Sequence, residues 1–408
     1  MKQERIYPKF TVSAKAERAL AAGHPWVYGT EVLRQEPCEN GAVADVVSAK
    51  GRYLGTGFVS EKSKIRVRVF SRNANDTFDG EFWRRRLAHA WAYRKTVLRP
   101  EELSCCRVIF GEADLFPGLT VDRFGPLLSV QVLSMGMERL KEQLFPLLVD
   151  VLRADGQQIA GIYERNDVAI RGLEGLEQYK GWYDLSEYGM PCPARPLAEI
   201  VENGVRYTVD VENGQKTGFF LDQKYNRAAV ARLAEGKNVL DCFTHTGSFA
   251  LNAAKGGARH VTAVDVSEAA VEMARHNAQI NGVADVMECV AADVFELLPS
   301  LPSNRYDFII LDPPAFTKSR KTLHSALRGY KEINYRAMKL LPRGGYLATC
   351  SCSHFATEEE FCRMLRGAAR DAGVQLRQIE ALQQSPDHPI LWGVPETSYL
   401  KFYLFQVV

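Results

Sequence analysis

From residue 237 to the C-terminus the sequence alternates strictly between strand patterns and helix patterns, and this alternation restricts the possible folds more than any other feature. The strand patterns are KNVLDCF (237–243), HVTAVDV (260–266), VMECVAAD (286–293), YDFIILDPP (306–314), YLATCSCS (346–353), VQLRQIEAL (374–382) and SYLKFYLFQVV (398–408). Helix patterns fill the gaps, so we expect an α/β fold with a mostly parallel seven-stranded sheet covered on both faces. Its ligand should bind at the carboxyl ends of the strands.

Two smaller modules precede this region. Residues 1–72 read as short strands separated by turn signals and predict a small β-barrel. Residues 73–190 mix strand patterns with helix patterns such as FWRRRLAHAWAYRKTVL, and predict a small central α+β domain. The proline-rich stretch PCPARPL begins the third domain, 191–408, which opens with a hairpin carrying two Asn-Gly turn signals.

Charge is distributed unevenly along the chain. The net charge is only +2, but residues 1–100 hold 19 Lys and Arg against 10 Asp and Glu. This excess indicates that the N-terminal part binds a polyanion. Lys64, Arg66 and Arg68 alternate with apolar residues, which places three cations on one face of a strand. That face is either a nucleic-acid surface or a solvated edge that discourages aggregation.

Composition also excludes several protein classes. No run of about 20 apolar residues predicts a membrane span, and the first residues lack the apolar core of a signal peptide. We therefore expect a cytoplasmic protein without a membrane partner. The nine cysteines contain no C-x-x-C pair, so neither a disulfide framework nor a metal site is expected.

Three successive strand patterns of the C-terminal region end in an acidic residue. Asp241 begins the stretch DCFTHTG, whose Gly247 would let the loop pass close to a ligand before a helix begins. Asp265 stands where a carboxylate could accept both hydroxyls of a ribose, and Asp293 where it could accept from an adenine amine. The alternative for Asp265 is a helix N-cap. The loop lacks both G-x-G-x-x-G and a P-loop motif, which favours a nucleoside without phosphates.

These motifs, D-x-F-x-x-x-G, V-x-x-V-D and the Asp-Pro-Pro that begins at Asp312, resemble those of the Rossmann-like class I methyltransferases. The resemblance covers about 197–408 and implies that S-adenosyl-L-methionine is the cofactor. Pro313 and Pro314 would hold the loop that receives a flipped target base. The resemblance implies that the cofactor is bound by Asp241, Phe243, Thr246, Gly247, Asp265, Asp293 and Asp312.

Two cysteines occur in the fifth strand pattern, LATCSCSH. Cys352 lies where RNA cytosine-5 methyltransferases carry the thiolate that adds to C6 of the pyrimidine, and this resemblance makes it the expected nucleophile. The alternatives are a buried structural thiol and, with less support, a zinc ligand. Cys350 is expected to pack in the core. Two-cysteine members of these enzymes have Asp-Pro-Pro-Cys, where this chain has Ala315, so the base that assists product release is not predicted. Asp312 could hydrogen-bond the cytosine N3 or amino group.

The whole chain resembles the bacterial 23S rRNA 5-methylcytosine methyltransferases that carry an N-terminal PUA domain. GHPWVYGTEV, FGEADLFPGLTVDRFG, KTGFFLDQKYNR and RGYKEINYRAMKLLPRGG carry this resemblance. It implies an RNA-binding PUA barrel over residues 1–72 and cofactor contacts from Phe220 and Gln223. Lys318 and Arg320 would contact phosphates beside the base, unless they belong to a solvated loop.

The expected partner is therefore 23S ribosomal RNA, with a homodimer left open. Two alternatives remain at this point. One is methylation of a base nitrogen of rRNA by the same fold. The other is a non-catalytic RNA-binding or ribosome-assembly factor.

Overall fold

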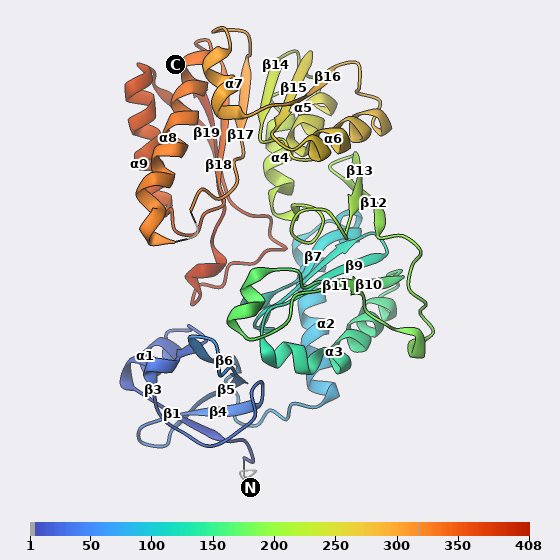
Figure 1. Ribbon diagram of the computed structural model, residues 1–408, viewed down its shortest axis with the longest axis vertical. Coiled ribbons are helices and arrows are strands. Elements are labelled where there is room, and N and C mark those ends of the chain that lie inside the picture. The colour runs from blue at the N-terminus through green and yellow to red at the C-terminus, as the bar shows by residue number, and fades with distance from the viewer. Residues whose placement is uncertain (1–4, 318) are drawn as a thin grey trace. The chain divides into compact units, whose positions relative to one another are not determined.

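The computed structural model describes residues 5–317 and 319–408. The chain forms two compact units, which we describe separately (Figure 1). Unit 1 contains residues 1–200, 209–221 and 386–397, and unit 2 contains residues 201–208, 222–385 and 398–408. The predicted domain boundaries at residues 72 and 190 stay predictions, because the barrel and the central α+β part belong to the same compact unit.

The first part of unit 1 is a six-stranded sheet in the order β2-β6-β5-β4-β1-β3. Its strands are β1 (Lys9–Val12), β2 (Trp26–Tyr28), β3 (Val32–Gln35), β4 (Val43–Ser48), β5 (Tyr53–Val59) and β6 (Ile65–Ser71). Helix α1 (Ala14–Ala21) begins after Ser13, whose hydroxyl accepts the Ala16 N–H. Alternate strand residues such as Val12, Val46 and Val67 form the core, as the strand periodicity predicts.

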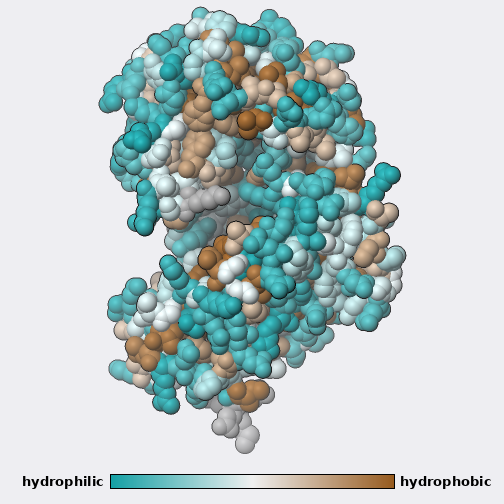
Figure 2. Space-filling model, viewed as in Figure 1, coloured by the Kyte–Doolittle hydropathy of each residue, from teal (hydrophilic) through white to brown (hydrophobic). Residues whose placement is uncertain are grey.

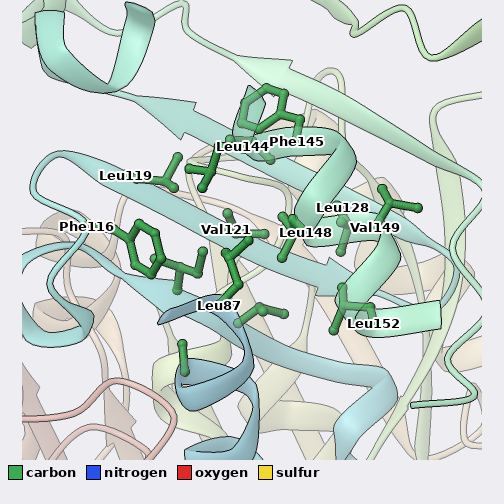
Figure 3. Packing of buried hydrophobic residues seen from close by; sticks show 14 of the residues in the cluster. Leu87, Phe116, Leu119, Val121, Leu128, Leu144, Phe145, Leu148, Val149 and Leu152 are labelled. Carbon is green, nitrogen blue, oxygen red and sulfur yellow. The ribbon is translucent and has the colours of Figure 1, made fainter. Parts of the chain in front are cut away.

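The second part of unit 1 is a five-stranded sheet in the order β11-β10-β9-β8-β7. Its strands are β7 (Cys105–Phe110), β8 (Leu119–Phe124), β9 (Leu127–Val132), β10 (Gly161–Arg165) and β11 (Lys180–Trp182). Helices α2 (Gly80–Val97) and α3 (Met135–Ala154) cover one face of this sheet. Figure 3 shows leucines of α3 directed toward Val121 and Leu128 of the sheet. The predicted α2 is confirmed, and its Trp83 and Trp91 are buried in this core.

A short segment of the C-terminal region also belongs to unit 1. Residues 386–397 lie between the last two strands of the chain, yet they belong to unit 1, where they contact both the barrel and the central α+β part. The Asp387 carboxylate accepts the Arg107 N–H at 2.9 Å, and its carbonyl accepts from Arg94 at 2.9 Å. The sequence patterns did not predict this placement.

Unit 2 contains a seven-stranded sheet in the order β16-β15-β14-β17-β18-β20-β19. Its strands are β14 (Asn238–Cys242), β15 (His260–Asp265), β16 (Met287–Ala291), β17 (Phe308–Leu311), β18 (Tyr346–Ser351), β19 (Leu376–Leu382) and β20 (Lys401–Val407). Only β20 runs antiparallel to its neighbours. The predicted mostly parallel sheet is therefore confirmed. Its central strands place their carboxyl ends at one edge.

Helices cover both faces of this sheet (Figure 1). One group is α4 (Lys224–Ala231), α5 (Ser248–Lys255) and α6 (Glu268–Ile280), and the other is α7 (Val294–Ser300), α8 (Leu323–Leu340) and α9 (Glu358–Ala372). The predicted hairpin is formed by β12 (Leu197–Glu202) and β13 (Val205–Asp210). Asn203 and Gly204 have φ angles of 54° and 75°, as a tight Asn-Gly turn requires.

Polar residues cover most of the face drawn in Figure 2, and apolar residues form small separate patches. Across the described ranges, no helix combines the length and the apolar character needed to cross a membrane. Within the same ranges, no group of three or more His, Cys, Asp or Glu side chains is arranged to hold a metal ion.

Candidate active site

The loop after β14 adopts a conformation that L-residues rarely take. Phe243, His245 and Gly247 have φ angles of 65°, 52° and 85°. A Cβ atom on Gly247 would lie 3.0 Å from Met287 Cε and 3.1 Å from Ala274 Cβ, so a larger residue would displace its neighbours. Helix α5 begins at the next residue, Ser248. The predicted start of a helix directly after Gly247 is confirmed, and the close approach of this loop to a ligand stays a prediction.

The Asp241 carboxylate holds this loop through hydrogen bonds to residues on both sides of Gly247. One carboxylate oxygen accepts the Thr244 hydroxyl at 2.5 Å and the Ala250 N–H at 2.9 Å. The other oxygen has no hydrogen-bond partner among the described residues. Complete burial raises the pKa of Asp241 to about 7. Asp241 thus stabilises the conformation of the loop after β14, and its predicted direct contact with a cofactor stays a prediction.

Asp265 closes the other side of the loop. Its two carboxylate oxygens accept the N–H groups of His245 at 2.9 Å and Ser267 at 3.0 Å. The alternative that Asp265 is the N-cap of α6 is wrong, because the hydroxyl of Ser267 caps that helix through the Ala270 N–H. Asp265 therefore lies at the end of β15, where the predicted ribose contact requires a carboxylate.

Asp293 differs from the other two carboxylates. It is exposed and is the N-cap of α7, accepting the Phe295 N–H at 2.8 Å. A capping role explains its residue type without a ligand. Phe243 and Thr246 are both half-buried beside the loop, and the Thr246 carbonyl accepts from Asn277 at 3.1 Å. The cofactor contacts proposed for these residues stay predictions.

Asp312 follows β17 and is partly buried, in contact with a polar cluster. The Gln223 side-chain amide donates to the Asp312 carboxylate at 3.0 Å, and Asn226 donates to Gln223 at 2.5 Å. Cys350 is fully buried close to Asp312, whose charge acts on the pKa of this thiol in the same direction as burial. Burial raises the pKa of Cys350 well above its ordinary value. Gln223, predicted as a cofactor contact, is thus engaged in orienting Asp312, and Cys350 packs in the core as predicted.

Cys352 lies just beyond the end of β18 and is partly exposed. The next residue, Ser353, donates its hydroxyl to the Thr317 carbonyl at 3.3 Å. This bond ties the residues after β18 to the Asp-Pro-Pro loop (residues 312–317), and β17 pairs directly with β18. The thiol is therefore carried beside the Asp-Pro-Pro loop and is not sealed in the core.

A lysine that was not predicted from the sequence also lies at this site. Lys401, on β20, stands opposite Ser351 and donates its ammonium to the carbonyls of Ser353 at 2.6 Å and Ala356 at 2.8 Å. Burial lowers the pKa of Lys401 to about 8, while the charge of Cys352 acts in the opposite direction. The signal that could have identified it is a single lysine within the apolar run of the last strand.

The residues predicted to contact RNA near the thiol are only partly accessible. Pro313 is buried, whereas Pro314 and Arg320 are exposed. Lys318 lies outside the described residues. Phe316 packs against Tyr330 with ring centroids 4.6 Å apart, which supports the Asp-Pro-Pro loop from the protein side.

Two further predictions concern unit 1. The Phe220 ring lies 4.5 Å from the Lys216 ammonium, and its proposed contact with the cofactor stays a prediction. Lys64 is exposed and Arg66 is half-buried.

Arg68 requires a correction. Its guanidinium pairs with Glu112 at 3.3 Å and with Glu174 at 3.0 Å, and its side chain is only 13% exposed. Two carboxylates already neutralise this cation, so Arg68 joins the barrel to the α+β part of unit 1 and is not available to a phosphate.

The residues around the β14 loop fit the nucleoside of S-adenosylmethionine. The loop can approach a ligand closely at Gly247, where no side chain intervenes, and Asp265 supplies a carboxylate at the adjoining strand end. The buried Asp241 oxygen without a partner adds negative potential beneath the loop, which suits a cationic sulfonium.

Comparisons with known proteins identify the family of this chain. Residues 186–406 match the family of S-adenosylmethionine-dependent methyltransferases, and residues 10–72 match PUA-like domains. Ribosomal RNA large subunit methyltransferase I from Shewanella amazonensis is 43% identical over 396 residues, which cover 96% of this chain and 97% of the relative. The protein of the same name from Klebsiella pneumoniae is 38% identical, with 99% and 100% covered.

Solved structures support the fold. A SAM-dependent methyltransferase from Streptococcus mutans has a TM-score of 0.80 at 21% identity, with 98% of this chain and 99% of that chain covered. A methyltransferase crystallised with SAH also has a TM-score of 0.80, at 20% identity and the same coverage. The family match and the full-length relatives lead to one conclusion: the chain belongs to the S-adenosylmethionine-dependent methyltransferases and to the group that contains ribosomal RNA large subunit methyltransferase I.

Proposed function

We propose that this protein methylates C5 of a cytosine in 23S ribosomal RNA through a covalent bond between Cys352 and C6 of the base. The observation that carries the proposal is the position of Cys352, partly exposed at the end of β18 and tied through Ser353 to the Asp-Pro-Pro loop. The names of the full-length relatives support ribosomal RNA of the large subunit as the substrate.

The chemistry requires a thiolate because cytosine C5 is a weak nucleophile. When the Cys352 thiolate adds to C6, the C5–C6 double bond opens and its electron pair becomes available at C5. S-Adenosylmethionine, when bound, supplies an electrophilic methyl group. After methylation, C5 loses its proton to a base and the Cys352–C6 bond breaks, which restores the aromatic ring and the thiolate.

The environment of Cys352 favours this role over one for Cys350. Cys350 is fully buried and its raised pKa keeps it protonated. Cys352 lies near the ammonium of Lys401, and a nearby cation stabilises a thiolate. Only the second thiol combines access with charge stabilisation.

Asp312 is held in place for recognition of the base. Gln223 fixes one of its carboxylate oxygens, which limits rotation of the side chain. From this position Asp312 would hydrogen-bond the cytosine N3 or amino group and stabilise protonation of the adduct. Ala315 carries no acid or base, so the C5 proton must leave to water or to another group.

Methylation of a base nitrogen is the second candidate. It would use Asp312 and the two prolines to orient an amine, and Cys352 would then be unnecessary. A non-catalytic RNA-binding or assembly factor would need neither. The braced loop over Asp241 and Asp265 argues against that third alternative, since a protein without a cofactor gains nothing from burying an unpartnered carboxylate oxygen.

The test compares Cys352→Ala with Cys362→Ala, which removes another partly buried thiol of the same unit. We expect Cys352→Ala to keep S-adenosylmethionine affinity, measured by calorimetry, and to lose methyl transfer to large-subunit rRNA. RNA containing 5-fluorocytidine should trap a covalent complex with the wild type and with Cys362→Ala only. Mass spectrometry of the nucleosides identifies the product. Turnover by Cys352→Ala, or a methyl group on nitrogen, would refute the proposed mechanism.

A further inference from the structure

Unit 1 contains a groove along helix α2 that the proposed catalytic chemistry does not use. One cavity of about 430 Å³ is lined by Arg85, His89 and Tyr93 of α2, and a second of about 600 Å³ by Arg72. Arg86 and Asp76 line both cavities, which therefore adjoin each other. We call the two cavities together the α2 groove.

The cations of α2 divide into two groups. Arg84, Arg94 and Lys95 each form an ion pair with a carboxylate of unit 1. Arg85 and Arg86 have no carboxylate within ion-pair distance among residues 5–317 and 319–408. These two are the arginines of α2 that line the groove, and Arg72 lines it from outside the helix. The helix thus leaves its positive charge uncompensated only on the side that faces the groove.

Burial raises the free energy of the charged form of these arginines, because it removes water from the guanidinium groups. Arg86 stacks on Phe82, with its guanidinium carbon 4.4 Å from the ring centre, and donates to the Phe70 carbonyl at 2.7 Å. Burial lowers the pKa of Arg86 to about 10, and it also lowers the pKa of Arg72. A desolvated cation without a full counter-charge is stabilised by an incoming anion.

Two carboxylates, Asp76 and Asp114, line the same groove. Asp114 is neutralised by its ion pair with Arg94. Asp76 accepts hydrogen bonds from the Ser71 hydroxyl at 2.5 Å and the Asn73 amide at 2.9 Å. The charge of Asp76 offsets part of the field of Arg72, Arg85 and Arg86, and leaves the groove cationic. An anionic ligand is therefore favoured over a cationic one.

Aromatic side chains accompany the cations. Trp392 is 96% exposed, and its neighbours Leu391 and Gly393 line the groove. Tyr93 lines the other end and is 37% exposed. An almost fully exposed tryptophan is unusual in a folded protein and is typical of a binding surface. Cations that contact phosphates, combined with aromatic rings that stack on bases, are the two elements of a single-stranded nucleic-acid site.

We propose that the α2 groove binds a single-stranded segment of the RNA substrate, with Arg72 and Arg85 on its phosphates and Trp392 stacked on a base. This inference rests on the proposed function, because it assumes an RNA substrate, and it adds a binding site outside the catalytic unit. An acidic peptide would match the charge, but it has no planar base for Trp392.

The experiment measures binding of a fluorescein-labelled 12-nucleotide oligouridylate by anisotropy at several KCl concentrations. The variants are the double substitution Arg72→Gln with Arg85→Gln, and Trp392→Ala. Arg84→Gln is the matched control, because Arg84 is on the same helix but is paired with Asp150. Trp392→Phe keeps an aromatic ring. Circular dichroism and S-adenosylmethionine calorimetry verify that each variant is folded.

We expect the double variant to weaken binding on the order of 10-fold and to reduce the slope of log K against log salt by about 1.4. Trp392→Ala should also weaken binding on the order of 10-fold, while Trp392→Phe retains most of the affinity. Arg84→Gln should bind like the wild type.

Three results would overturn the proposal. One is wild-type affinity in the double variant and in Trp392→Ala. Another is that a polyglutamate peptide displaces the labelled RNA from the protein while Trp392→Ala leaves the RNA affinity unchanged. If the wild type methylates rRNA but both groove variants do so with unchanged KM, only this inference fails; if the wild type neither binds nor methylates rRNA, the proposed function fails as well.

Discussion

Replacement of Asp241 by Asn tests directly how the loop after β14 is held in its conformation. The side chain is fully buried, and one oxygen accepts the two hydrogen bonds that hold the loop. Asparagine has nearly the same shape, and its carbonyl oxygen can accept the same two bonds. Its amide group would then occupy the position of the oxygen that has no partner among the described residues. The substitution therefore removes the charge and keeps the packing.

The expected effect follows from the raised pKa of Asp241. Burial raises this pKa from 3.8 to about 7, and Asp312 and Asp265 contribute in the same direction. Between these two values the folded protein keeps a proton that the unfolded chain has released. The free energy of unfolding of the wild type should therefore fall, relative to Asp241→Asn, by about 1.4 kcal/mol for each pH unit in this window. The total is about 4 kcal/mol, reached near pH 7 and constant above it.

The assay is urea unfolding followed by circular dichroism between pH 4.5 and pH 8.5. The control is Asp285→Asn, because Asp285 is an exposed carboxylate of the same unit. Asp241→Asn should be the more stable protein at pH 8, and the difference should shrink as the pH falls. A difference that does not change with pH, or a variant less stable than the wild type at pH 8, would show that the carboxylate is not buried as a destabilising charge.

Two further predictions concern the same edge of the sheet. Lys401→Met removes the ammonium near Cys352, so the pKa of this thiol should rise. Alkylation of Cys352 by iodoacetamide at pH 7, measured by mass spectrometry, should then slow several-fold. Lys401→Arg should restore the rate. Gly247→Ala should lower S-adenosylmethionine affinity at least about tenfold in calorimetry, because strain at a positive φ costs about 1–3 kcal/mol and the added carbon displaces its neighbours. Gly172→Ala is its control, since nothing lies within 4 Å of a Cβ there.

Much of the fold could be predicted because it depends on local sequence patterns. The strands of unit 2 are apolar runs bounded by polar residues, and the helices between them are amphipathic, so each element is encoded by its own residues. The carboxyl ends of parallel strands lie at one edge of the sheet. The proximity of Asp241, Asp265 and Asp312 could therefore be predicted from their positions at the ends of strands. The Asn203-Gly204 turn was predicted for the same reason, since it needs only two adjacent residues.

The failures all involve partners that are distant in the sequence. Arg68 alternates with apolar residues like its neighbours, but its carboxylates are 44 and 106 residues away, so the pattern could not show that it is paired. Asp387 contacts Arg107 across 280 positions. Lys401 reaches back to the loop after β18 through strand pairing. The alternation of residues along a strand predicts which face of the sheet a side chain is on. The partners of that side chain depend on tertiary structure, which the local pattern does not contain.

The two cysteines at the end of β18 show how strongly the tertiary environment of a thiol affects its reactivity. They are two residues apart, so an extended strand directs both side chains to the same face. Cys350 still lies within the sheet, where it is fully buried beside Asp312 and cannot easily lose its proton. Cys352 lies one residue beyond the strand, where the chain leaves the sheet, the thiol is partly exposed and the Lys401 ammonium is near. The reactivity that we propose for Cys352 therefore depends on where β18 ends, and on the Ser353 and Lys401 hydrogen bonds that hold the residues after the strand.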